Sequence, residues 1–332
     1  MERIDAVVVG GGLGGLTCAY CLAQAGVQVL VLERGDHPGS KNVTGGRIYL
    51  RPLRPYLPEL WDAAPLERAV VKEVFTVMGE GSSCTVEFTS DRFREGPVHS
   101  YTILRSRFDK WLGERVMEKG GFVVPQRRVT DLMREDGRIV GVVSEGEEIP
   151  AQVVIAADGA LSLMAERAGL RKPLAPRNAA VALKEVIKLP PEVIEERFGL
   201  APGEGAARLF FGTITQGTFG GGFLYTNQET LSLGLVLGIE SFLQGETSPK
   251  THQLFEQFKG RKEIAHLMQG GELVEYSAHL IPEGGNRPCP QPYGDGILVI
   301  GDAAGLALNM GITVRGMEFA MASGHMAAQT VK

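Results

Sequence analysis

Cysteine is scarce in this chain, with four residues among 332. Cys18, Cys21, Cys84 and Cys289 are too few and too scattered for a disulfide framework, so a reducing compartment suits the chain better. Cys18 and Cys21 form a CxxC, but they lie in "LTCAYCLAQAG", whose apolar spacing predicts a helix packed on a sheet. No second CxxC follows, and we therefore expect no metal site.

Long apolar runs and clusters of basic residues are also missing. No stretch reaches the roughly 18 consecutive apolar residues that a spanning helix needs, and no basic-then-apolar signal precedes the first strand. The formal net charge of -5, without a run of lysine and arginine, argues against nucleic acid as the main partner. We expect a cytoplasmic protein that is at most peripheral to the inner face of the membrane.

Glycine, in contrast, is abundant, and a glycine-rich turn stands close to the start of the chain. The apolar run "AVVV" leads into Gly10, Gly12 and Gly15, and a helical pattern follows and ends at Gly26. The next apolar run, "VQVLVLE", ends at Glu33. This order is a complete βαβ unit, in which a pyrophosphate lies at the helix N-terminus and the acidic residue accepts hydrogen bonds from a ribose. Because Glu33 accepts these hydrogen bonds, the ribose is expected to have a free 2′-hydroxyl, which favours FAD or NAD over NADP.

The rest of the chain does not repeat this unit, as a plain NAD dehydrogenase would. An irregular passage rich in glycine and proline follows Glu33, and the later strand in "AQVVIAADGA" ends in the turn Asp158-Gly159. Near the C-terminus, "GILVIGDAAG" puts another apolar strand before Gly301 and Asp302. Two further turns at strand ends therefore accompany the glycine motif.

Together the three motifs resemble the FAD-dependent group that includes the hydroxybenzoate hydroxylases. The segments "SKNVTGGRIY", "ILRSRFDKWL", "GGGFLYTNQETLSLGLVLGI" and "PQPYGDGILVIGDAAGLALNMGITVRGMEFAMASG" resemble more closely the FixC-type electron transfer flavoprotein:quinone oxidoreductases, within the geranylgeranyl reductase superfamily. The resemblance runs from Ile4 to about Met326 and implies an α/β fold of the hydroxybenzoate-hydroxylase type. In that fold a Rossmann-type βαβ sheet binds FAD, and a mostly antiparallel β-sheet substrate domain is inserted.

On this basis the chain is expected to divide into five segments. The FAD-binding domain takes residues 1–75, 105–177 and 286–332. Strands of the substrate domain take 76–104, and its antiparallel sheet, which covers the flavin, takes 178–285. Such relatives usually extend further at the C-terminus, and we expect that extension to be absent here.

The same resemblance implies which residues hold FAD. Glu33 binds the adenosine ribose, Arg34 flanks the adenosine, and Arg105, in "RSRFD", reaches toward the pyrophosphate as a fixed cation. The backbone of Val129 meets the adenine edge, and Asp302 accepts hydrogen bonds from the ribityl chain. Further contacts are expected from the turns, at Gly10, Gly12, Leu13, Gly14, Gly15, Asp158, Gly159 and Gly301.

The reactive end of the flavin is expected to meet two segments. The segment "SKNVTGG" passes near the isoalloxazine, and its expected contacts are Lys41, Asn42, Gly45 and Gly46. The C-terminal helix is predicted to begin near Gly311 and Ile312, so that its N-terminal amides and its dipole stabilise the reduced ring. That arrangement tunes an electron carrier, and no catalytic side chain is assigned.

The predicted function is that of an FAD-dependent oxidoreductase. It relays electrons from an electron transfer flavoprotein to a quinone or a ferredoxin-like acceptor, so the expected partners include a ferredoxin-like subunit. Aromatic residues of the middle region are candidates for a quinone pocket or for ordinary core: Phe210, Phe211, Phe219, Phe223 and Tyr225. A prenyl-lipid reductase and an NAD(P)H-fed monooxygenase stay open as alternatives, although "GGGFLYTN" lacks the tryptophan typical of the reductases. A lipid-binding escort without flavin chemistry is disfavoured by Asp302.

Overall fold

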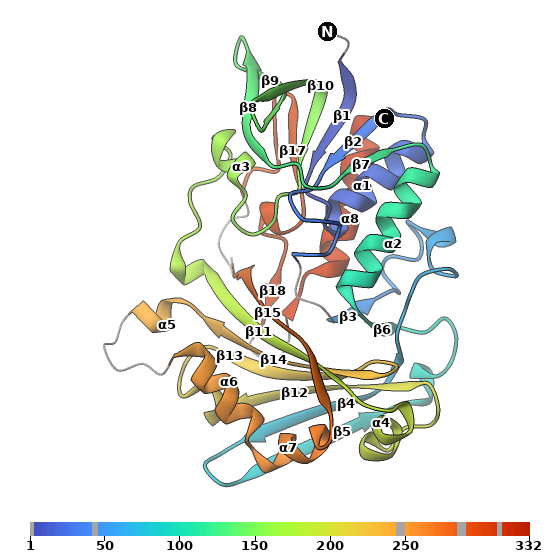
Figure 1. Cartoon of the computed structure of the whole chain (residues 1–332), viewed down its shortest axis with the longest axis vertical. Helices are drawn as coiled ribbons and strands as arrows, with labels where there is room; N and C mark the ends of the chain where they lie inside the picture. The colour runs from blue at the N-terminus through green and yellow to red at the C-terminus, as the bar shows by residue number, and fades with distance from the viewer. Residues whose placement is uncertain (1–2, 42–45, 244–249, 284–289, 311–313) are drawn as a thin grey trace.

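The computed structural model describes residues 3–41, 46–243, 250–283, 290–310 and 314–332. Two β-sheets lie one above the other in Figure 1, and helices pack against each of them. The first and the last parts of the chain both belong to the upper sheet and its helices, and most of the middle of the chain forms the lower sheet. The chain therefore leaves the upper unit and returns to it.

The upper sheet is built around parallel strands. They follow the order β7 (Phe122–Val124), β2 (Val29–Leu32), β1 (Ile4–Val9), β10 (Glu147–Ala156) and β17 (Ile297–Val299). Strand β16 (Tyr293–Gly294) adds an antiparallel edge, and β8 (Val129–Glu135) and β9 (Arg138–Ser144) form an antiparallel meander with β10. Val8 of β1 pairs with Val31 on one side and Ile155 on the other, which explains the unbroken apolar run. This order, with β1 at the centre, is that of the doubly wound dinucleotide folds.

Three helices pack together beside this sheet: α1 (Leu13–Gln24), α2 (Arg105–Glu118) and α8 (Met317–Val331). Helix α1 follows β1 directly and is almost wholly buried, as its small and apolar residues predict. Gly324 of α8 lies against Gly14 of α1, because a Cβ built on Gly324 would be 2.2 Å from the Gly14 carbonyl oxygen. The absence of a side chain lets the C-terminal helix approach the first helix of the chain.

The lower sheet is mostly antiparallel, which confirms the fold class expected from the sequence. Its strands follow the order β15 (Glu272–Pro282), β11 (Ala179–Lys188), β14 (Thr230–Gly238), β13 (Gly220–Thr226), β12 (Glu204–Gly212), β4 (Ala69–Met78), β6 (Ser100–Ile103) and β3 (Gly46–Tyr49). Strand β5 (Ser83–Thr89) pairs with β4, and the pairing of β12 with β4 is parallel.

The two faces of the lower sheet differ in the size of their side chains, as β14 shows. One face carries Leu231, Leu233, Leu235 and Leu237, all fully buried. They share a core with helices α4 (Pro191–Phe198), α6 (Thr251–Lys259) and α7 (Lys262–Met268), and each buried leucine contributes about 1.5–3 kcal/mol. The alternate residues, Ser232, Gly234, Val236 and Gly238, are small and face the upper sheet. Small residues on that face leave room between the two sheets.

Short elements complete the chain. These are α3 (Leu163–Arg167), α5 (Glu240–Leu243), β18 (Leu308–Asn309), β19 (Val314–Arg315) and the 3-10 turns η1 (Pro58–Leu60), η2 (Asp91–Phe93), η3 (Pro176–Asn178), η4 (Thr213–Thr215) and η5 (Gly301–Ala304). The sequence analysis expected the first FAD-binding segment to end at residue 75, but two strands before residue 76 belong to the lower sheet. Strand β3 pairs with β6, and β4 pairs with β12 from Ala69 onward. The division into five segments stays a prediction. No helix in the described part of the chain is long and apolar enough to cross a membrane.

Candidate functional site

A cavity of about 680 Å³ lies between the two sheets. Its volume falls within the roughly 300–1,000 Å³ that is usual for small-molecule sites. The carboxyl ends of β1, β10 and β17 open onto it, which is where doubly wound folds bind their ligands. The expected FAD contacts within the described residues all line this cavity: Gly10, Gly12, Leu13, Gly14, Gly15, Glu33, Arg34, Lys41, Gly46, Arg105, Val129, Asp158, Gly159, Gly301 and Asp302. Asn42, Gly45, Gly311 and Ile312 lie outside the described residues.

The glycine turn presents a free helix N-terminus to the cavity. Gly12 is the N-cap residue of α1, no side chain caps it, and the first turn contains no acidic residue. The first backbone N–H groups of a helix have no partner within it, so such an end favours an anion. A Cβ built on Gly12 would meet nothing within 4 Å, which leaves the approach to these amides open.

The neighbouring glycines are required by close packing. Gly10 has φ +107°, and a Cβ there would lie 2.4 Å from the carbonyl oxygen of Ala157 in the adjacent strand connection. A Cβ on Gly15 would lie 2.2 Å from the carbonyl oxygen of Gly10. The turn thus has this shape because strand, helix and backbone meet without side chains between them.

Glu33 is fixed at the end of β2 by the backbone on either side of it. Its Oε2 accepts a hydrogen bond from the N–H of Gly11 at 2.7 Å, and its Oε1 accepts one from the N–H of Gly35 at 2.6 Å. The residue is only 8 % exposed. Each carboxylate oxygen keeps a second lone pair, so the group can still accept hydrogen bonds from a ribose.

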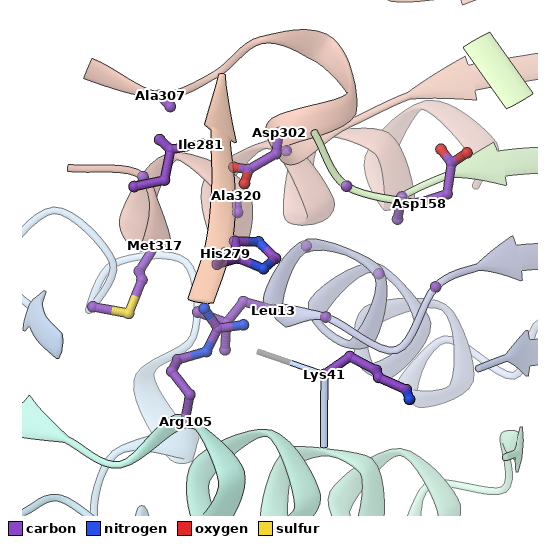
Figure 2. A pocket seen from close by; sticks show the side chains of 18 of the residues that line it. Leu13, Lys41, Arg105, Asp158, His279, Ile281, Asp302, Ala307, Met317 and Ala320 are labelled. Atoms are coloured by element: carbon purple, nitrogen blue, oxygen red, sulfur yellow. The ribbon is translucent and has the colours of Figure 1, made fainter. Parts of the chain in front are cut away.

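Arg105 is the first residue of α2 and lines the cavity from below in the close view (Figure 2). Its Nε and one terminal nitrogen donate to the two carboxylate oxygens of Asp109, at 2.8 and 2.7 Å. This bidentate pair fixes the plane of the guanidinium group. The remaining N–H groups are available to an anion, as expected for a residue that reaches toward a pyrophosphate.

Asp158 and Asp302 follow two neighbouring strands but are used differently. The carboxylate of Asp158 accepts hydrogen bonds from the Ser162 hydroxyl and the Met164 N–H, both at 2.9 Å, so it shapes the turn before α3. The Asp302 side chain points into the cavity in Figure 2 and has no hydrogen-bond partner within the described part of the chain. Burial raises the pKa of both carboxyl groups, and for Asp302 the cations of Arg105 and Arg171 act against that rise.

The start of the C-terminal helix differs from the prediction. Helix α8 begins at Met317, not near Gly311, because Val314 and Arg315 pair with Leu308 and Asn309 as a short antiparallel ladder. Gly316, Met317 and Ala320 line the cavity from this first turn. Any stabilisation of a bound anion by the dipole of α8 therefore comes from this later turn.

Three cations form a smaller hollow beside the main cavity. It is lined by Arg34, Lys41 and Arg128, which are all exposed. None of these side chains has an ion-pair partner among the residues that the structure describes. The resemblance assigns Lys41 to the ring end of the flavin, but the structure brings its side chain beside Arg34, the residue expected to flank the adenosine.

The lower sheet supplies a wall of the cavity, and the sequence analysis identified only Gly46, Phe223 and Tyr225 among its lining residues. Its lining residues include Ala182 of β11, Phe223 and Tyr225 of β13, Val236 of β14, and His279 and Ile281 of β15. Phe223 and Tyr225 are stacked, with ring centroids 5.0 Å apart and 21° between their planes. The available signal was the alternation of polar residues in "EYSAHLI", which puts Glu275, Ser277 and His279 on one face of a strand.

The other aromatic candidates of the middle region do not line this cavity. Phe210 is buried on the opposite face of the sheet, where its ring meets Phe258 edge-on at 5.2 Å. Phe219 is 54 % exposed. Phe211 does not line the cavity either, so only the stacked pair of Phe223 and Tyr225 is left from the group as a candidate wall for a planar ligand.

Paired arginines close one end of the cavity. The guanidinium group of Arg47 makes two hydrogen bonds to Glu73, and that of Arg315 pairs with Glu318. Both arginines lie over the ring of Tyr49, at 4.6 and 4.1 Å from its centroid. Because each charge is compensated and each cation is stacked on the ring, this end of the cavity is held rigidly.

The three cysteines that the structure describes do not line the cavity. Cys18 and Cys21 are buried and free in α1, as the helix interpretation predicts, and Cys84 is exposed on β5. Cys289 lies outside the described residues. Within the described part of the chain, no three His, Cys, Asp or Glu side chains are arranged to hold a metal ion.

These features fit a bound dinucleotide. One cavity is lined by an uncapped helix N-terminus, the guanidinium group of Arg105, the fixed carboxylate of Glu33 and the carboxylate of Asp302. Family models described as FAD dependent oxidoreductase match residues 5–171 and 98–330. The chain belongs to the FAD-dependent oxidoreductases, and its cofactor is FAD.

Individual relatives indicate which type of FAD-dependent oxidoreductase the chain is. Protein FixC of Escherichia coli O157:H7 is 46% identical over 99% of this chain and 77% of its own length. A protein of Escherichia coli K12 named "Probable electron transfer flavoprotein-quinone oxidoreductase YdiS" is 44% identical over 99% of this chain and 76% of its own. Within its family the chain is thus of the FixC type.

A solved structure supports the fold. The geranylgeranyl bacteriochlorophyll reductase-like protein of Thermoplasma acidophilum superposes with a TM-score of 0.77 at 23% identity. The match covers 100% of this chain and 78% of that one. At this identity the likeness extends to the fold alone.

Proposed function

We propose that this protein relays electrons from an electron transfer flavoprotein, through its FAD, to a quinone or a ferredoxin-like acceptor. The observation that carries the proposal is the 44% identity, over 99% of the chain, to a relative named for electron transfer flavoprotein and quinone. A ferredoxin-like subunit and a peripheral contact with the membrane belong to the same proposal.

FAD supplies the electron chemistry, because it exchanges one or two electrons. The protein's part is to hold the cofactor and control access to it. The N-terminus of α1 and Arg105 hold the diphosphate, Glu33 holds the ribose, and Asp302 holds the ribityl chain. The fixed backbone donors on Glu33 and the bidentate Arg105 pair support these roles because they hold both groups in place before the cofactor arrives.

The aromatic pair on β13 is the proposed wall for the acceptor ring. Phe223 and Tyr225 give a stacked, largely apolar surface within the cavity, which suits a planar ring. Burial raises the pKa of the Tyr225 hydroxyl, so this group stays protonated and can donate a hydrogen bond to a quinone carbonyl. No acid or base is needed for this role.

One observation favours a second candidate, a monooxygenase whose flavin is reduced by NAD(P)H. The cationic hollow of Arg34, Lys41 and Arg128 would attract the phosphates of a nicotinamide nucleotide. In that case NADPH, and not a protein donor, reduces the flavin.

The acceptor half of the proposal is tested by reoxidation. Holoprotein reduced by light under anaerobic conditions is mixed with a short-chain quinone, and the return of flavin absorbance is followed. The wild type is expected to reoxidise at a rate that depends on quinone concentration. Tyr225→Phe should weaken quinone binding about tenfold, as expected for the loss of one hydrogen bond of about 1.4 kcal/mol.

Tyr276→Phe is the matched control, because Tyr276 is an exposed residue of β15 that does not line the cavity. This variant should behave as wild type. A reduced wild-type protein that quinone does not reoxidise would remove quinone as the acceptor. A Tyr225→Phe variant as efficient as Tyr276→Phe would remove the role of the hydroxyl alone.

A further inference from the structure

His279 brings a titratable side chain from the lower sheet into the cofactor cavity. It lies in the middle of β15, where it pairs with Ala182 of β11, and both residues line the cavity. In the view of Figure 2, its ring appears between the labelled side chains of Asp302 and Arg105, which line the same cavity. The imidazole has no hydrogen-bond partner within the described part of the chain.

The charged groups around His279 are mainly cations. Arg105 faces it from α2, held by Asp109, and Arg34 faces it from the end of β2. Asp302 of η5 is the facing carboxylate across the cavity. On the sheet itself, the same face carries Ser277 and Glu275 of β15 and Lys184 of β11.

This environment disfavours a protonated ring in the protein alone. Burial, and to a smaller extent the nearby charges of Arg105 and Arg34, together lower the pKa of His279 to about 4. The imidazole is therefore neutral at pH 7 before the cofactor binds.

Bound FAD would shift the protonation equilibrium of the His279 imidazole. Its diphosphate brings two negative charges to the cavity that contains the N-terminus of α1, Arg105 and His279. Negative charge favours the protonated imidazole, and it also offsets the two arginines that oppose protonation. We propose that His279 is a further FAD-binding residue, which takes up one proton from solvent when the diphosphate enters the cavity.

The pH dependence follows from linkage. A group whose pKa is higher in the complex than in the free protein strengthens binding below its free pKa, and the effect is lost as pH rises through the bound pKa. Between about pH 4 and the pKa in the complex, FAD affinity should fall by up to about tenfold per pH unit. This inference depends on FAD binding but not on the electron donor or acceptor.

The experiment measures release of FAD from the holoprotein on dilution, by the rise in flavin fluorescence, between pH 5 and pH 8. The wild type is expected to release FAD more readily as pH rises, and His279→Gln should lose this slope. His266→Gln is the matched control, because His266 lies on α7 away from the cavity and contacts the carbonyl oxygen of Lys262. It should keep the wild-type slope.

Calorimetry of FAD binding to the apo-protein, in two buffers of different ionisation enthalpy at pH 6, counts the proton directly. The wild type and His266→Gln should take up close to one proton more than His279→Gln. A purely structural role of His279 would lower affinity equally at every pH and leave the proton count unchanged. That result, or a wild type whose affinity does not vary with pH, would overturn the proposal.

Discussion

The carboxylate of Glu33 accepts a hydrogen bond from the backbone N–H of Gly11 at 2.7 Å. This contact joins the end of β2 to the glycine turn after β1, and the second carboxylate oxygen binds the N–H of Gly35. Glu33 therefore holds the glycine turn and the end of β2 together. Under the proposed function it also binds the ribose of FAD, so its substitution should affect both roles.

Glu33→Ala should weaken FAD binding strongly, because the ribose loses its acceptor and two backbone donors lose theirs. Leaving one buried donor unsatisfied costs about 1–3 kcal/mol. Glu33→Gln, which keeps one acceptor oxygen, should fall between Ala and wild type. Fluorescence titration of the apo-proteins gives the dissociation constants, and equal affinities of Glu33→Ala and wild type would refute the ribose assignment.

Gly12→Ala and Gly324→Ala should separate cofactor binding from stability. A methyl group on Gly12 projects into open space at the N-terminus of α1, so the variant should fold normally and bind FAD poorly. A methyl group on Gly324 meets the Gly14 carbonyl oxygen, and such overpacking costs about 1–3 kcal/mol of unfolding free energy. Urea denaturation of both apo-proteins, with FAD titrations, measures the two effects. If both variants lost FAD affinity and stability to the same extent, the assignment of Gly12 to an open surface and of Gly324 to a packed contact would be wrong.

Asp302→Ala and Asp158→Ala should likewise differ. Asp302 points into the cavity without a described partner, so its loss should reduce FAD affinity about tenfold or more, as for a hydrogen bond to a charged group worth about 1.5–3 kcal/mol. Asp158 supports the turn before α3, so its loss should mainly lower the midpoint of thermal unfolding. Absorbance of bound flavin and a thermal melt of each apo-protein distinguish these outcomes. A large loss of affinity in Asp158→Ala with an unchanged melt would show that this carboxylate contacts the cofactor itself.

Thiol alkylation should report the burial of the first helix. Iodoacetamide at pH 8 should modify Cys84, which is exposed, and spare Cys18 and Cys21 in the folded protein. The pKa of the Cys21 thiol is raised to about 11, mainly by burial; Lys332 acts against this rise and Glu59 adds to it. Peptide mass spectrometry gives the modified positions. Modification of Cys21 as fast as Cys84 would support a reactive CxxC.

The sequence revealed the parts of the site whose geometry is local. The order and spacing of the βαβ unit indicated the glycine turn and Glu33, and the resemblance to the FAD-dependent group indicated Asp302. The wall of the lower sheet depends on pairing between distant segments, such as Ala182 with His279, and no local pattern specifies that register.

The start of α8 shows a different limit of sequence analysis. The apolar spacing of "GITVRGMEF" continues the helical pattern upstream of Met317, but Val314 and Arg315 form a short ladder with Leu308 and Asn309. Tertiary pairing overrides the helical pattern there. The prediction of the helix was right and its first residues were wrong.

The central claim is that a protein donor reduces the flavin, and one measurement tests it most directly. Holoprotein is mixed anaerobically with reduced electron transfer flavoprotein, and separately with NADPH, and bleaching of its flavin absorbance is followed by stopped flow. We predict rapid bleaching by the reduced flavoprotein and none by NADPH on the same timescale. Bleaching by NADPH alone would contradict the account and favour the monooxygenase.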